Sequence, residues 1–285
     1  MPFATGAELA GLVGQGLVVH IDAVVEVVEQ TTTNVIADSQ GGRTDRTVVI
    51  GAHLDSVPEG PGINDNGSGS AAILETALQM SELGITPRNA VRVAFWGAEE
   101  SGLIGSQYYV DQLSARDLKN IAAYLNFDMV GSPNFVRFVY DGDGSAFGSS
   151  GPNGSAHIEN TFTSYFASQG LPSEPTEFDG RSDYEAFILA GIPAGGLFTG
   201  AEGIKTPEQA AIYGGTAGVA YDPCYHEACD TYANNSDTGL DQMSDAIAHA
   251  TLTYAMTTSA VNGTAKASTN AKKYDPAFSG HHLRR

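Results

Sequence analysis

Histidine and carboxylate side chains follow several short apolar segments of the sequence, at the point where each segment ends. These segments are short and mostly apolar, as buried strands are. Because the carboxyl ends of parallel strands meet at one edge of a sheet, we expect the side chains that follow them to lie close together. They are His53 and Asp55 after the segment 48–50, Glu99 and Glu100 after 91–95, and Asp128 after 122–127.

Asp65 and His226 complete this set. Asp65 lies 12 residues after His53 in the turn "GINDNGSGS", and His226 lies in "CYHEACD". Taken singly, each residue has an ordinary explanation, such as a helix cap, an Asx turn or a solvated carboxylate. Together, nitrogen and oxygen ligands at one sheet edge indicate a metal site that suits zinc.

The charges favour two ions rather than one. Two Zn²⁺ ions carry four positive charges, and the carboxylates of Asp65, Glu100 and Asp128 with one hydroxide would balance them. Glu99 is then left as a carboxylate beside the metals. Hydrolysis needs such a base, because a proton must pass from water to the leaving group.

The elements that must position these residues alternate along the chain. Strands are predicted at 48–50, 91–95, 122–127, 135–139 and 192–197, and helices over 67–84, 159–170 and 240–256. This order predicts an α/β fold, a mostly parallel twisted sheet with helices on both faces. In the first helix, an apolar stripe is expected to be buried, and residues 18–42 suggest two strands joined near 31–33. The stripe comprises Ile73, Leu74, Ala77, Leu78 and Leu83.

The composition limits the possible partners. The 285 residues carry a formal net charge of −19, with a pI of about 4.5. Such a surface repels nucleic acid and anionic membranes. No apolar run approaches the roughly 18 residues of a membrane span, and no signal peptide is recognisable. We therefore expect no nucleic acid partner and no membrane span.

The two cysteines, Cys224 and Cys229, are separated by four residues. Their closeness in a histidine-containing loop favours a disulfide, which would imply an oxidising compartment. Two reduced thiols are the alternative. A zinc site of the Cys-x-x-Cys type is excluded, because the spacing is wrong and there is no second pair.

Long stretches of the sequence resemble a known family. They include "GAHLDSV", "GPGINDNGSGSAAILETAL", "FWGAEESGLIGSQYYV", "YLNFDMVGSPN", "GRSDYEAF", "GIPAGGLFTGAE" and "CYHEACD". The chain is similar, over about residues 34–260, to the co-catalytic two-zinc aminopeptidases of metallopeptidase clan MH, especially the secreted Streptomyces and aminopeptidase Y groups. The resemblance implies the zinc-exopeptidase type of fold.

The resemblance also implies roles for the metal ligands. His53 and Asp128 would bind one zinc ion, Glu100 and His226 the other, and Asp65 would bridge both, with a cis peptide bond at Asp65–Asn66. Whether zinc, cobalt or manganese is bound in the cell depends more on availability than on ligand type.

Further roles are implied around the metals. Glu99 would be the general base, Asp55 would hydrogen-bond the distal ring nitrogen of His53, and Tyr225 would donate its hydroxyl to the oxyanion. The substrate site would comprise Met129 and Phe198, which would line an apolar pocket, and Arg181, which would frame the amine site. The alternatives are that Tyr225, Met129 and Phe198 simply pack in the core and that Arg181 forms a surface ion pair.

Two features depart from the resemblance. Asp237, Asp241 and Asp245 match a calcium site of the Streptomyces type, but its N-terminal ligands are not matched, and a solvated helix face is favoured. The helices that normally begin the peptidase domain also have no visible counterpart. Residues 1–30 are therefore interpreted as the remnant of a protease-associated domain or an altered N-terminus, 31–262 as the peptidase domain, and 263–285 as a polar tail.

The function expected from the sequence is hydrolysis of the N-terminal peptide bond of peptides with a free N-terminus. Large apolar N-terminal residues would be favoured, Glu99 would activate the water between the zinc ions, and the full-length form would be secreted. The alternatives are a clan-related zinc deacylase or carboxypeptidase, a single-zinc enzyme like glutaminyl cyclase, or a non-catalytic or truncated relative that acts only as a binding module.

Overall fold

The structure is a computed structural model that describes residues 3–20, 22–25, 29–261 and 272–273. The chain divides into two compact units, residues 1–31 and 32–285. The first unit contains the helix α1 (Phe3–Gly11). The strand predicted before residues 31–33 is wrong for the described residues 18–20, 22–25 and 29–30, which form no strand. Most of the predicted polar tail lies outside the described residues.

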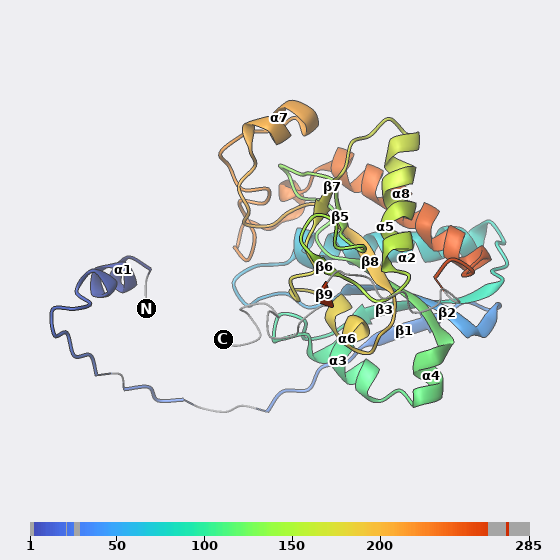
Figure 1. The fold of residues 1–285 in the computed structure, drawn as a ribbon, viewed down its shortest axis with the longest axis horizontal. Helices are drawn as coiled ribbons and strands as arrows, with labels where there is room; N and C mark the ends of the chain where they lie inside the picture. The colour runs from blue at the N-terminus through green and yellow to red at the C-terminus, as the bar shows by residue number, and fades with distance from the viewer. Residues whose placement is uncertain (1–2, 21, 26–28, 262–271, 274–285) are drawn as a thin grey trace. The chain divides into compact units, whose positions relative to one another are not determined.

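The second unit is built on a twisted mixed sheet of seven strands, in the order β1-β3-β2-β4-β8-β5-β7 (Figure 1). The central strands β3, β2, β4 and β8 run parallel to one another, whereas β1 and β5 each pair antiparallel with a neighbour. The predicted α/β fold is therefore confirmed. The strands are β1 (Val35–Asp38), β2 (Arg43–His53), β3 (Asn89–Trp96), β4 (Ile121–Phe127), β5 (Phe138–Tyr140), β7 (Glu174–Thr176) and β8 (Ala194–Phe198).

Helices cover both faces of this sheet (Figure 1). One apolar core packs under α2 (Gly69–Glu82), α5 (Ser155–Ser168) and α8 (Asp237–Met256). The other packs under α3 (Ile104–Asp111), α4 (Ala115–Asn120) and α6 (Tyr184–Leu189). The remaining elements are η1 (Ile63–Ser68), α7 (Pro207–Tyr213), η2 (Tyr232–Asn234) and the pair β6 (Ser149–Ser150) and β9 (Lys272–Lys273).

Successive residues of β2 contribute to opposite cores. Val48 and Ile50 belong to the core under α2, α5 and α8, and Val49 belongs to the core on the other face. All three side chains are fully buried. A central parallel strand is covered on both faces, so its sequence is continuously apolar rather than alternating.

The buried face of α2 differs from the predicted stripe. Ile73 is fully buried as expected, but Leu74 and Leu78 are each 48% exposed. Leu83, just beyond the helix, is 72% exposed. The helix packs against the sheet through Ile73 and small residues, with Ala77 and Met80 partly buried against the same core. The other buried residues of α2 are Gly69, Ser70, Ala72 and Thr76.

Candidate metal and active site

The carboxyl ends of the parallel strands bring the predicted residues together. His53 is the last residue of β2, and Asp128 directly follows β4. Gly51 pairs with Asn126 in the parallel register of these strands, so that two residues further on His53 and Asp128 lie opposite each other. The distance from Nε2 of His53 to Oδ1 of Asp128 is 3.1 Å. Glu99 and Glu100 lie three and four residues after the end of β3.

Asp65 lies between two groups of potential ligands. Its Oδ1 is 3.1 Å from Nε2 of His53, and its Oδ2 is 3.2 Å from Nε2 of His226. His226 is in turn 3.0 Å from Oε2 of Glu100. The ligand atoms of His53, Asp65 and Asp128 lie within 4.8 Å of one another, as do those of Asp65, Glu100 and His226. Each carboxylate oxygen of Asp65 therefore faces a different histidine.

The donor atoms fit metal ions better than they fit one another. Oε1 of Glu100 and Nε2 of His226 are buried and make no hydrogen bond with the described residues, although each lies among close polar neighbours. Buried charged groups are normally paired, hydrogen-bonded or bound to a metal. Imidazole and carboxylate ligands in this number suit Zn²⁺. The two sets of atoms, which share Asp65, could thus hold two cations.

The surroundings of Asp65 and Glu99 shift the pKa values of these two carboxylates in opposite directions. Burial alone would raise the pKa of Asp65, but the adjacent imidazoles of His226 and His53 hold it well below its usual value. Burial raises the pKa of Glu99 well above its usual value; the charge of His53 opposes this, and nearby carboxylates add to it. Asp65 is therefore suited to remain an anionic ligand, and Glu99 is suited to accept and return a proton.

The turn that presents Asp65 is held by residues that the sequence analysis did not identify. Oδ1 and Oδ2 of Asp230 accept hydrogen bonds from the backbone nitrogens of Asn64 and Asp65, at 2.9 and 3.1 Å. The amide of Asn64 donates to Asp222 at 2.6 Å. The Asp65–Asn66 peptide bond is cis, as the resemblance implied. The signal in the sequence was the acidic residue on either side of the cysteine pair, in "DPCYHEACD".

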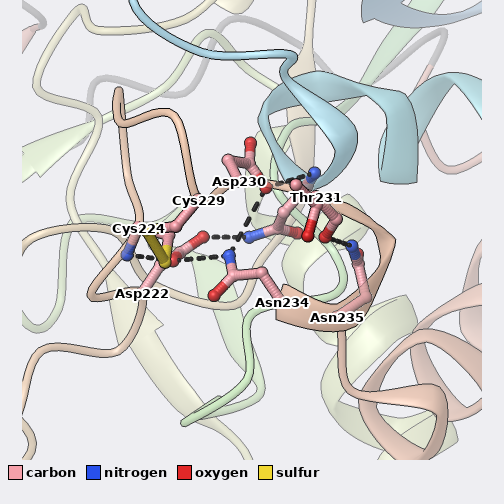
Figure 2. Close-up of a disulfide and its surroundings, with 8 residues drawn as sticks. Asp222, Cys224, Cys229, Asp230, Thr231, Asn234 and Asn235 are labelled. Carbon is pink, nitrogen blue, oxygen red and sulfur yellow. Dashed lines mark hydrogen bonds between the residues drawn. A yellow bond between two sulfur atoms is a disulfide. The ribbon is translucent and has the colours of Figure 1, made fainter.

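The loop that carries His226 is closed by a disulfide between Cys224 and Cys229 (Figure 2). This confirms the predicted pairing. Asp222 and Asp230 flank the disulfide and share the amide of Asn234, at 2.8 and 3.4 Å. The same short loop thus supplies His226 and the carboxylate that holds the Asp65 turn.

Backbone conformations that are unfavourable for side chains cluster around the site. Ala98, Met129 and His226 have φ of 57°, 49° and 59°. The first two are adjacent to Glu99 and Asp128, and His226 is itself a ligand candidate. Such conformations cost free energy and persist where surrounding structure enforces them, which is frequent at functional sites.

Tyr225 and Arg181 both line the cleft that contains the ligand candidates. The guanidinium of Arg181 donates to the hydroxyl of Tyr225 at 3.2 Å and forms an ion pair with Glu202 at 2.7 Å. The ring of Tyr225 stacks on that of His226, with 3.8 Å between centroids. Because its oxygen accepts from Arg181, the Tyr225 hydroxyl can direct its hydrogen into the cleft.

The cleft contains the predicted apolar residues. Met129 and Phe198 line it together with Tyr140, beside the ligand candidates and Glu99. Met129 is 3% exposed, and Phe198 stacks against Phe138. The apolar wall is therefore continuous with the core, and the same side chains can pack and border the cleft.

Asp55 makes contacts other than those predicted. Nδ1 of His53 donates to the backbone carbonyl of Asp55 at 3.0 Å, and the Asp55 carboxylate lies 3.8 Å from that nitrogen. The carboxylate instead accepts from the backbone nitrogens of Glu99 at 3.0 Å and Glu100 at 3.3 Å. The expected carboxylate–histidine hydrogen bond is therefore not present, because the strand end places a backbone carbonyl in that position.

The acidic residues considered for calcium lie elsewhere. Asp237, Asp241 and Asp245 are exposed on α8 and are not among the groups of converging ligand atoms in the described residues. A different group, Asp141, Asp143 and Glu159, does converge. Its carboxylates accept hydrogen bonds from backbone nitrogens of the loop 142–147, which accounts for their positions. No helix in the described residues has the length and apolar character needed to cross a bilayer.

The chain is similar to named aminopeptidases over most of its length. The chain is 55% identical over 245 residues to an aminopeptidase of Pseudomonas aeruginosa, covering 85% of the chain and 45% of the relative. It is 53% identical over 251 residues to leucine aminopeptidase 2 of Trichophyton equinum, covering 88% and 50%. The chain thus spans about half the length of the curated relatives it matches.

A solved structure of a zinc aminopeptidase from Bacillus subtilis superimposes with a TM-score of 0.61 at 29% identity, over 76% of this chain and 48% of that one. The family model described as Peptidase family M28 matches residues 34–251, which include every ligand candidate and Glu99. The chain belongs to peptidase family M28.

Proposed function

We propose that this chain carries the catalytic unit of a zinc-dependent aminopeptidase. The observation that supports this most strongly is the position of Asp65, whose two oxygens face different histidines within two separate ligand groups. Glu99 lies beside them, in a group with His53 and Glu100 whose ligand atoms are within 4.8 Å of one another. A carboxylate next to two cation sites can take a proton from water and return it to the leaving amine, as hydrolysis of an amide needs.

Two zinc ions would be held by the residues already described. His53, Asp65 and Asp128 would hold one, and Asp65, Glu100 and His226 the other. When bound, such ions polarise the carbonyl of the scissile bond and make water a stronger nucleophile at neutral pH. The relatives named aminopeptidase and the zinc aminopeptidase of Bacillus subtilis support this choice of metal and reaction.

Glu99 would move the proton. Its burial favours the protonated form after it has taken a proton from the attacking water, so that it can return that proton to the leaving amine. Tyr225 would stabilise the negative charge that develops on the carbonyl oxygen. Its hydroxyl oxygen accepts from Arg181, so its hydrogen is available to donate to that oxygen. Glu99 and Tyr225 thus lie on the same cleft with complementary tasks.

The cleft suits a peptide N-terminus with an apolar first side chain. Met129, Tyr140 and Phe198 offer the apolar wall, and Glu177 and Asp179 add negative charge to the lining. A protonated amine is attracted to such a lining, and a blocked, neutral N-terminus is not. We therefore expect large apolar N-terminal residues to be preferred, in agreement with the name of the Trichophyton relatives.

The disulfide supports an oxidising location. Disulfides persist in secreted and extracellular proteins and are rare where thiols are kept reduced. The pair Cys224–Cys229 is part of the loop that supplies His226. We therefore propose that the protein works outside the reducing cytosol.

The experiment compares leucyl-p-nitroanilide with its N-acetylated form, for zinc-loaded protein and after chelation. Cleavage of the free-amine substrate alone, lost on chelation and restored by zinc, is the expected result. Cleavage of both substrates would instead indicate a deacylase or endopeptidase. No cleavage by folded, zinc-loaded protein would contradict the proposal for this chain.

A further inference from the structure

A chain of hydrogen bonds runs through the core and ends on Asp128. The indole nitrogen of Trp96 donates to the hydroxyl of Tyr124 at 2.8 Å, which donates to Oδ1 of Asn126 at 2.9 Å. The amide nitrogen of Asn126 donates to Ser182 at 2.8 Å, and the hydroxyl of Ser182 donates to Oδ2 of Asp128 at 2.6 Å. All five residues are at most 8% exposed.

The two end groups of this series, the indole of Trp96 and the carboxylate of Asp128, determine the direction of every hydrogen bond between them. An indole N–H can only donate, and an ionised carboxylate can only accept. The hydroxyl of Tyr124 must therefore donate its hydrogen bond to the amide oxygen of Asn126. This orients the amide so that its nitrogen faces Ser182. Ser182 is then left with its hydrogen directed at Asp128. Burial raises the pKa of Tyr124 well above its usual value, so its hydroxyl keeps the hydrogen that the chain requires.

The packing of the strands β2, β3 and β4 allows Trp96 and Tyr124 to form their hydrogen bond. Trp96 lies on β3 and Tyr124 on β4, and β2 runs between these strands. A β-carbon at position 51 of β2 would overlap both the Tyr124 hydroxyl and the Trp96 indole nitrogen. Gly51 therefore lets the two side chains meet across the strand. The ring of Tyr124 is stacked on Phe187, with 3.8 Å between centroids and an interplanar angle of 1°.

The two oxygens of Asp128 are thereby given different surroundings. Oδ2 receives the hydrogen of Ser182, whereas Oδ1 faces His53 in the candidate metal group. A carboxylate held by a hydrogen bond on one oxygen presents the other in a fixed direction. Residues that orient a metal ligand in this way typically change metal affinity or activity about 10–100-fold when they are removed.

We propose that Trp96 and Tyr124 are positioning residues for Asp128, and that they act through Asn126 and Ser182 to keep one carboxylate oxygen available for the cation. The proposal rests on the metal site of the proposed function. It makes a specific prediction, because only the group His53, Asp65 and Asp128 is attached to the chain of hydrogen bonds. The group formed by Asp65, Glu100 and His226 should be unaffected.

The test uses Tyr124→Phe, which removes the hydroxyl and keeps the ring that stacks on Phe187. The matched control is Tyr254→Phe, since Tyr254 is also buried, at 1% exposure, and its hydroxyl bonds to Thr161 and His157 away from the site. Each change is placed in two backgrounds. His226→Ala leaves the group containing Asp128, and His53→Ala leaves the group containing Glu100. The zinc dissociation constant is measured by competition with a chromophoric chelator.

Tyr124→Phe should weaken zinc binding about 10-fold in the His226→Ala background. It should change zinc binding less than about 2-fold in the His53→Ala background. Tyr254→Phe should have no effect in either. Trp96→Phe should act in the same direction as Tyr124→Phe but less strongly, because Tyr124 could still donate to Asn126.

An unchanged affinity in the His226→Ala background, or an equal loss in both backgrounds, would overturn the proposal while leaving the metal site in place. If the unmodified protein itself binds no zinc, the proposed function fails and this inference fails with it. Circular dichroism of each variant separates these outcomes from unfolding.

Discussion

The carboxylate of Asp55 holds the backbone nitrogen of Glu99 at 3.0 Å, and it lies farther, at 3.8 Å, from the ring of His53. The same carboxylate accepts from the next backbone nitrogen, that of Glu100. A carboxylate that accepts hydrogen bonds from two consecutive backbone N–H groups fixes the local path of the chain. Asp55 is thus connected to the proposed base and to one ligand of the second metal group.

Asp55→Ala should therefore affect the Glu100 group more than the His53 group. In the His53→Ala background, we expect zinc affinity to fall by about 10-fold, and in the His226→Ala background by much less. Asp55→Asn should be intermediate, since its amide oxygen can still accept one of the two bonds. Chelator competition measures both. A loss confined to the His226→Ala background would support the direct Asp55–His53 interaction instead.

Glu99→Gln should abolish turnover while leaving the metals bound. The amide has the same shape as the carboxylate but cannot accept a proton, and general base catalysis contributes about 10²- to 10⁴-fold. We expect kcat on leucyl-p-nitroanilide to fall by that factor with an unchanged zinc content, measured by atomic absorption. A variant with near-normal kcat would show that another group moves the proton.

Replacing both cysteines by serine should weaken the site on its His226 side. The disulfide closes the loop that carries Tyr225 and His226 and lies between Asp222 and Asp230 in the sequence. We expect a loss of about 2 kcal/mol or less in the free energy of unfolding, because the closed loop is short. Zinc affinity in the His53→Ala background should fall as well. Unchanged affinity there would show that the hydrogen bonds of Asp230 and Asp222 are sufficient.

Asp183 should make the metal-free protein less stable as the pH rises. Burial raises the pKa of Asp183 to about 7, against the lowering effect of His53, and the carboxylates of Asp128 and Asp55 add to the increase. Because the folded pKa exceeds the unfolded value of 3.8, the folded state holds the proton more tightly. Stability is therefore lost between about pH 4 and pH 7.

Asp183→Asn removes this dependence. Relative to the unmodified protein, the variant should gain stability progressively from pH 4 to pH 7, by on the order of a few kcal/mol at the upper end. Urea unfolding of the chelated proteins at several pH values measures the difference. A difference that does not change with pH would contradict the raised pKa.

The sheet and the ligand candidates could be predicted from the sequence because each signal is local. A buried parallel strand is a continuous apolar run, and the residue that follows it must lie at the sheet edge. Four such runs became β2, β3, β4 and β8. The run at 135–139 was less well predicted, since β5 begins only at Phe138.

The sequence does not show which of several nearby groups a given side chain will bond to. The carboxylate of Asp55 and its own backbone carbonyl are both within reach of His53, and only the backbone geometry decides between them. In the same way, Leu74 and Leu78 lie on the predicted apolar stripe but are exposed, because smaller residues of α2 face the sheet. Tyr124 lies in the predicted strand 122–127 and Trp96 directly follows the predicted strand 91–95, but their contact across Gly51 depends on strand order.

The position of Asp65 between two groups of ligand atoms implies that two cations share it. X-ray diffraction from zinc-loaded crystals, recorded at the zinc absorption edge, tests it most directly. We expect two anomalous peaks on either side of Asp65, one beside His53 and Asp128 and the other beside Glu100 and His226. A single peak, or peaks that do not contact Asp65, would contradict it.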